Sequence, residues 1–141
     1  MDLDLHLLSI AGNAVAVASQ SEVDASVACD PVSPQSFLIY CINIRWLLSD
    51  FAELCHRVKV FSPHVDFFQE TWLNKSIEEV QLPNYRIVSR RDRSEGENRG
   101  GIATYARLDI YNMVCVKISI ESERVWHFLH LDVGTIAVCN W

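Results

Sequence analysis

Apolar residues follow two different periods in the first half of the folded chain, which predicts two strands joined by a helix. Residues 37–44 (FLIYCINI) form a continuous apolar run with aromatic and β-branched side chains, a pattern typical of a strand buried on both faces. Apolar residues then recur at every third or fourth position across 51–61, which indicates a helix that Pro63 ends. A second buried strand follows at 65–69. Because such crossovers are right-handed, we expect the two strands to lie parallel in one sheet.

Alternating apolar and polar residues after this unit predict a run of antiparallel strands. Residues 85–90 and 102–107 form an expected hairpin whose long charged tip is 91–101. Further strands are expected at 111–120, 124–132 and 135–141, the last two turning at Asp132–Gly134. Ser76 is expected to cap a short helix that runs to Val80 and ends before Pro83. The order of elements predicts the α/β class, with a mixed sheet in a sandwich layer.

Residues 1–36 differ from the rest of the chain. The start, MDLD, is acidic where a signal peptide is positive, and the apolar stretch 5–18 is broken by polar residues and too short to span a bilayer. Residues 19–36 have the composition of a linker. We therefore expect a loosely structured or disordered segment at 1–36, a folded domain at 37–141, no membrane partner, and an intracellular location, nuclear or cytoplasmic.

Charge and cysteine usage narrow the classes of partner and cofactor. The net charge is −6, but residues 1–42 hold five acidic and no basic residues, whereas residues 43–141 hold 12 basic and 13 acidic ones. An anionic partner for the folded part is therefore not excluded. The five cysteines are odd in number and widely spaced, which indicates reduced thiols and not a disulfide framework. A zinc site needs two pairs of ligands, and neither Cys55-His56 nor His127-x-x-His130 has a matching second pair in the sequence.

Two polar residues are predicted to meet at one edge of the sheet. Asn43 lies near the end of the first strand and Glu70 directly follows the second. Ligands of open α/β sheets gather beyond the carboxyl ends of parallel strands, and Mg²⁺ accepts a carboxylate, neutral oxygens and several waters there. Two alternatives stay open: Glu70 as a surface turn residue, and Asn43 as a partner for backbone groups at the strand end.

Other residues near these positions are given plainer roles. Trp46 and Trp72 are interpreted as packing anchors in preference to base-stacking platforms. Gly100-Gly101 is interpreted as a bulge or a tight backbone entry into the next strand, because a strand follows it and a phosphate cradle requires a helix. The arginines of the charged loop fit a solvated loop as well as a DNA contact.

Four stretches resemble a known family. They are CINIRWLLSDFAEL, DFFQETWLN, NYRIVSRRDRSEGENRGGIATYAR and WHFLHLDVGTIAVCNW. Together they are similar to the first half of an endonuclease/exonuclease/phosphatase domain, above all the endonuclease domain of non-LTR (LINE-type) retrotransposons. The resemblance covers residues 37–141 and none of 1–36. It implies a partial α/β sandwich of that type.

The resemblance also implies an activity and a site. The family nicks DNA for target-primed reverse transcription, with Mg²⁺ or Mn²⁺ as cofactor. Its metal-binding glutamate falls on Glu70, and its first-strand asparagine, which supports the metal and phosphate region, falls on Asn43. Arg99 lies where a DNA phosphate contact is expected.

The family's later motifs are missing from this sequence, and this leaves three readings. The tyrosine turn, the Asp-x-Asn motif, a further aspartate and the Asp-His pair do not occur, so we expect a truncated nuclease fragment that is inactive by itself. The second reading is a non-catalytic remnant whose edge strand 135–141 pairs with another chain by β-augmentation. The third is a hydrolase of lipid phosphates or small phosphoesters with the same fold.

Overall fold

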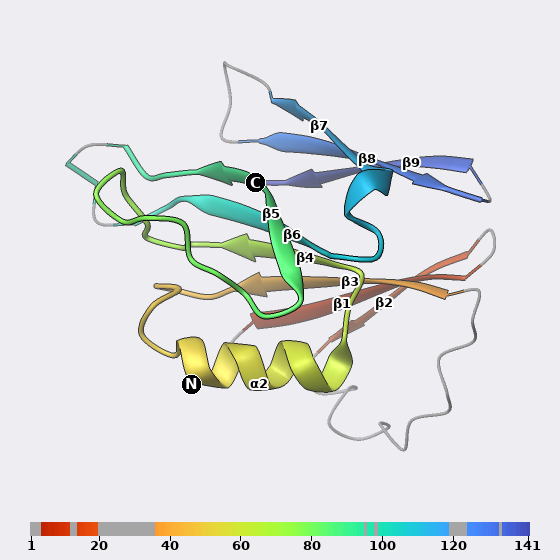
Figure 1. Cartoon of the computed structure of the whole chain (residues 1–141), viewed down its shortest axis with the longest axis horizontal. Helices are drawn as coiled ribbons and strands as arrows, with labels where there is room; N and C mark the ends of the chain where they lie inside the picture. The colour runs from red at the N-terminus through yellow and green to blue at the C-terminus, as the bar shows by residue number, and fades with distance from the viewer. Residues whose placement is uncertain are drawn as a thin grey trace.

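The computed structural model describes residues 4–11, 14–19, 36–94, 96–97, 99–118, 124–132 and 134–141. These residues form three layers: helix α2 (Phe51–Phe61), a six-stranded sheet, and a three-stranded sheet on the opposite side from the helix (Figure 1). Within the described ranges no helix has the length and apolarity needed to cross a bilayer. The α/β class with a mixed sheet is confirmed.

The large sheet has the strand order β2-β1-β3-β4-β6-β5. Its strands are β1 (Asp4–Ala11), β2 (Ala14–Ser19), β3 (Ser36–Asn43), β4 (Val65–Gln69), β5 (Tyr85–Arg91) and β6 (Ile102–Arg107). β3 and β4 are parallel, as the strand–helix–strand pattern predicted, and every other pair is antiparallel. The β5–β6 hairpin is confirmed, with a bulge between Ile87 and Ser89. The carboxyl ends of β3 and β4 therefore lie side by side at the same end of the sheet.

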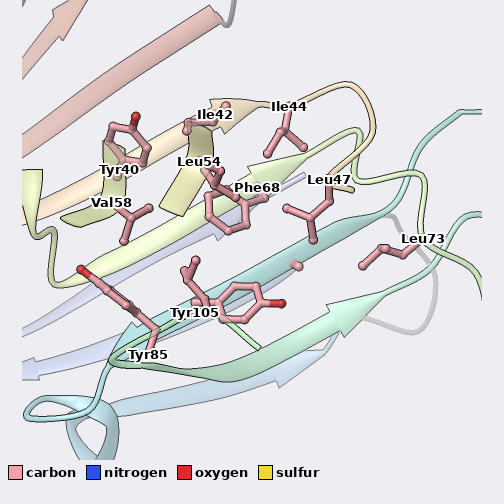
Figure 2. Close-up of a cluster of buried hydrophobic side chains, with 12 residues drawn as sticks. Tyr40, Ile42, Ile44, Leu47, Leu54, Val58, Phe68, Leu73, Tyr85 and Tyr105 are labelled. Atoms are coloured by element: carbon pink, nitrogen blue, oxygen red, sulfur yellow. The ribbon is translucent and has the colours of Figure 1, made fainter. Parts of the chain in front are cut away.

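Helix α2 covers one face of the large sheet through its apolar stripe. Leu54 and Val58 are buried against side chains of the strands, Tyr40 and Phe68 among them (Figure 2). The helix ends at Ser62, whose φ of 44° is left-handed and whose N–H donates to the carbonyl oxygen of Val58. The structure describes no capping hydrogen bond from Asp50 at the other end. Most of the stability of this helix is therefore expected to come from burial of the apolar stripe.

The opposite face packs against the small sheet, β7 (Val114–Ile118), β8 (Val125–Leu131) and β9 (Gly134–Asn140), in the order β7-β8-β9. Phe37, Ile39, Val65 and Phe67 of the large sheet form one buried cluster with Leu129 of β8. The β8–β9 pair is confirmed. The strand expected over 111–120 begins later, at Val114, because a 3-10 turn, Tyr111–Met113, precedes β7; residues 119–120 lie outside the described residues.

Two segments differ from the sequence-based expectations. Residues Asp4–Ala11 and Ala14–Ser19, within the segment expected to be loose, are strands, and β1 pairs with the edge of β3. Their alternating sequences lie on either side of a Gly-Asn dipeptide, which is a hairpin signal. The helix expected at 76–80 is absent from the described residues, because the side chain of Asn74 binds the backbone N–H of Ser76 at 2.9 Å and closes a turn there.

Candidate divalent-cation and phosphate site

Asn43 and Glu70 lie side by side at the carboxyl ends of β3 and β4. Asn43, the last residue of β3, is in register with Gln69, and Glu70 follows as β4 ends. Both line a pocket of about 450 Å³, together with Arg45, Trp72 and Arg99. The structure thus brings together all three residues that the sequence singled out, Arg99 included.

Asn43 contributes an unused acceptor. Its Oδ1 atom is buried and has no hydrogen-bond partner among the described residues. Buried acceptors are nearly always paired with protein or water, so this oxygen is available to water or to another partner beyond the described residues. The alternative role for Asn43, satisfying backbone groups at the strand end, is not what Oδ1 does here.

The Glu70 carboxylate is held on one side only. Its Oε2 atom accepts hydrogen bonds from the indole N–H of Trp72 at 2.8 Å and from the backbone N–H of Gly100 at 3.0 Å. No residue in the described part of the chain bonds to the other oxygen, Oε1. The carboxylate is therefore fixed in orientation and keeps one oxygen for a ligand.

Left-handed backbone conformations are concentrated around this pocket. Arg45, Trp46, Glu70 and Trp72 have φ values between 44° and 85°, which are rare for residues other than glycine. Each costs free energy that the surrounding structure must offset, and such residues gather at functional sites. Of the pocket residues, Arg45, Glu70 and Trp72 belong to this group.

Backbone hydrogen bonds join the loops that carry these residues. The N–H of Trp46 donates to the carbonyl of Glu70 at 2.9 Å, and the N–H groups of Thr71 and Trp72 donate to the carbonyls of Gly101 and Gly100 at 3.1 and 2.9 Å. The loops after β3 and β4 and the segment before β6 thus continue the pairing of their strands. This pairing holds the strained conformations in place.

Gly101 is required by this close approach. Its φ is +86°, and a Cβ atom there would lie 2.7 Å from Oγ1 of Thr71, a buried side chain. No other residue type avoids both the strain and the clash. Gly100 and Gly101 both have positive φ values and directly precede β6, so the expected tight backbone entry into this strand agrees with the geometry.

The charged loop before these glycines supplies further hollows beside Glu70. Glu70 also lines a smaller pocket of about 120 Å³ with Arg91 and Arg93, and both arginines line a larger hollow of about 970 Å³. Arg90 in that hollow is structural: it pairs with Asp92 and binds three backbone carbonyls. The basic character of the loop is therefore divided between internal pairing and the rim of the site.

Several residues in or near the pocket have roles that the sequence pattern does not reveal. Trp46 is 47 % exposed, so its interpretation as a packing anchor is wrong. Trp72 acts through its N–H group, which the aromatic pattern does not reveal. Arg45 lines the pocket two residues after Asn43, at a position that no sequence motif marks. The backbone N–H of Gly100 carries no side-chain signal at all.

The described residues provide few further metal ligands or bases. They contain no group of three or more His, Cys, Asp or Glu side chains placed to hold a metal ion. His127 is buried between the two sheets, where its Nε2 atom lies 2.9 Å from the hydroxyl of Ser89. Desolvation lowers the pKa of His127 to about 4, so its ring is neutral near pH 7.

Comparison with known proteins adds no family to these observations, since no protein-family model and no curated protein matches the chain. The chemistry of the pocket follows from its side chains. Oε1 of Glu70 and Oδ1 of Asn43 suit a hard cation, and the guanidinium groups of Arg45 and Arg99 suit a phosphate. The lining of this one hollow therefore combines two side-chain oxygen acceptors with two guanidinium groups.

Proposed function

We propose that this chain is the first half of a phosphodiester-cleaving nuclease of the endonuclease/exonuclease/phosphatase type, with Mg²⁺ or Mn²⁺ as cofactor and DNA as substrate. The observation that carries the proposal is a pair of oxygens to which no described residue forms a hydrogen bond, Asn43 Oδ1 and Glu70 Oε1, on adjacent strand ends in a pocket that also holds Arg45 and Arg99. A structural turn requires neither free acceptors nor two guanidinium groups.

The residues present fit a small divalent cation. Mg²⁺ is usually bound by one or two carboxylates and keeps several waters and substrate oxygens, so a site with one carboxylate and one amide oxygen is sufficient to hold it. The orphaned Asn43 Oδ1 acceptor supports this fit. When bound, the cation would polarise a phosphoryl oxygen and lower the pKa of water.

The chain's own groups would bind and orient the substrate. Arg45 and Arg99 would donate to phosphate oxygens, and each guanidinium can present two parallel N–H groups. Glu70 is held by two donors, so it would not have to reorganise when ligands bind. No histidine or second carboxylate of the described residues lines this pocket. We therefore expect binding of cation and DNA with little or no turnover.

Manganese binding and plasmid nicking test the proposal together. Free Mn²⁺ is measured by electron paramagnetic resonance, and nicking of a supercoiled plasmid is followed with Mg²⁺. Mn²⁺ binding is expected to disappear in Glu70→Ala and to persist in Glu79→Ala, which removes an exposed carboxylate outside the pocket. Retention of Mn²⁺ binding in Glu70→Ala would refute the cation site. Strong nicking that depends on Glu70 would refute the expected inactivity.

DNA binding is tested by a matched pair of arginine variants. Arg99→Ala is expected to weaken duplex binding and to lower its salt dependence, because one phosphate contact is lost. Arg57→Ala makes the same change of charge on helix α2, where Arg57 pairs with Glu53 at 2.8 Å, and should leave binding unchanged. Equal effects of the two substitutions would show that only overall charge matters. A small phosphodiester supplied in place of the plasmid distinguishes a phosphoesterase of the same fold.

A non-catalytic interaction role is the second candidate. β9 lies at an edge of the small sheet, and its sequence GTIAVCN has no charged residue or proline, the usual protections against pairing with another strand. A partner strand could add there by β-augmentation. Sedimentation over a range of concentrations tests this candidate, since a monomer at every concentration excludes self-association through β9.

A further inference from the structure

Both hydrogen bonds to the Glu70 side chain converge on one of its two oxygens. The Trp72 indole and the Gly100 amide approach Oε2 at 2.8 and 3.0 Å and come from different segments, one after β4 and one before β6. An N–H donor and a cation compete for the same lone pairs, so Oε2 is a poor metal ligand while both bonds stand. Oε1 is left as the coordinating atom.

Trp72 is held firmly in this role. Its backbone has a φ of 54°, and its own N–H donates to the Gly100 carbonyl at 2.9 Å. Trp72 and Gly100 therefore bind each other through the backbone and bind Glu70 together. The side chain is only partly buried, which places the indole at the pocket wall and not in the core.

We propose that Trp72 is a positioning residue that makes Glu70 a one-oxygen ligand and thereby favours Mg²⁺ and Mn²⁺ over Ca²⁺ at this site. The proposal rests on the cation site of the proposed function. Ca²⁺ takes six to eight oxygens and often binds both oxygens of a carboxylate, whereas Mg²⁺ requires octahedral geometry with single-oxygen ligands. A carboxylate with one oxygen occupied by two N–H groups satisfies Mg²⁺ and denies Ca²⁺ its two-oxygen contact.

Trp72→Phe isolates the N–H group, because phenylalanine keeps an aromatic ring at the pocket wall and has no donor. Metal affinity is measured by Mn²⁺ paramagnetic resonance, with Mg²⁺ and Ca²⁺ as separate competitors. Trp126→Phe is the matched control, since Trp126 is exposed on β8 of the other sheet. Outer partners of metal ligands typically contribute roughly 10- to 100-fold in affinity. We expect Mg²⁺ affinity to fall by about tenfold in Trp72→Phe, and Ca²⁺ affinity to fall less or to rise.

A second measurement needs no metal and no folded Trp72 variant. The chain has four tryptophans, so an ¹H–¹⁵N spectrum contains four indole signals. The Trp72 signal is expected to exchange slowly with solvent in the parent protein and to shift in Glu70→Ala. The Trp126 signal should not move.

The outcomes separate the two proposals. An unchanged ratio of Ca²⁺ to Mg²⁺ affinity in Trp72→Phe overturns the role of Trp72 and leaves the cation site standing. An indole signal that does not respond to Glu70→Ala overturns it as well. Absence of any Glu70-dependent Mn²⁺ binding overturns the cation site and this inference with it.

Discussion

Gly101→Ala provides a direct test of the packing that holds the Glu70 loop. The added methyl group would lie 2.7 Å from Thr71 Oγ1, and 3.3 Å from the Arg91 carbonyl oxygen and from the Arg93 backbone nitrogen. Two of these neighbours are backbone atoms, and Thr71 is fully buried, so the clash cannot be relieved by turning one exposed side chain. The loop that carries Glu70 must shift instead.

The magnitude has two parts that a control can separate. Placing alanine at a φ of +86° costs roughly 1–2 kcal/mol, and forcing a methyl group into filled space costs about 1–3 kcal/mol more. We therefore expect Gly101→Ala to lower the free energy of unfolding by about 2–5 kcal/mol. Gly96 has nearly the same φ, +85°, but a methyl group added there would meet no atom of the described residues within 4 Å. Gly96→Ala should lose only the conformational part.

Urea denaturation followed by circular dichroism measures both losses. A double-mutant cycle with Thr71→Ala adds a second comparison, because removal of Oγ1 takes away the closest contact. Gly101→Ala should cost less in the Thr71→Ala background than in the parent protein. Equal losses for the Gly96 and Gly101 variants, or strict additivity with Thr71→Ala, would refute the steric account.

Three further predictions concern buried polar groups. Burial raises the pKa of Asp66 well above its usual range, so the folded protein keeps a proton that the unfolded chain releases above about pH 4, and the free energy of unfolding falls as the pH rises. Relative to the parent protein, Asp66→Asn should become more stable by up to about 1.4 kcal/mol for each pH unit, and parallel plots of stability against pH for the two proteins would disprove this. Desolvation lowers the pKa of His127 to about 4, so the unfolded chain binds a proton that the folded protein does not, and stability should fall as the pH drops from about 6.5 towards 4. An NMR signal of the His127 ring that titrates near pH 6.5 would contradict the lowered pKa. Asn140→Leu leaves the Gln69 amide and two acceptors on β6 without a hydrogen-bond partner, so the free energy of unfolding measured with urea should fall by about 2–4 kcal/mol. The control Thr135→Val changes an exposed residue and should have little effect.

Side-chain periodicity was a reliable guide to the elements that bury one or two faces. The strands at 65–69 and 102–107 and the helix at 51–61 were predicted with bounds that match those of the structure. Their signals are local, because burial of a strand face or a helix stripe sets the spacing of apolar residues. The helix expected at 76–80 was inferred from Ser76 as a cap and Pro83 as a stop, and it is wrong, because the Asn74 side chain closes a turn that competes with a helix.

The N-terminal strands β1 and β2 were not predicted, because the pairing of β1 with β3 depends on residues outside the segment. The stretch at 5–18 is too short and too often broken by polar residues for a membrane span, yet it has apolar runs on both sides of Gly12-Asn13, which is a hairpin signal. Its pairing with β3 depends on a free sheet edge formed by residues far along the chain. Strand pairing of this kind is not encoded in the segment itself.

The sequence by itself determined that two parallel strands end together and that Asn43 and Glu70 stand at those ends, because strand direction and side-chain alternation follow from local pattern and crossover handedness. Only the tertiary structure decided which atoms of those residues are free. Oε2 of Glu70 is occupied by an indole two residues away and by an amide 30 residues away, and the Asn43 oxygen has no described partner. The reason is physical: periodicity places a side chain on a face or an edge, whereas a hydrogen bond requires two atoms within about 3 Å, and segments distant in sequence set that distance.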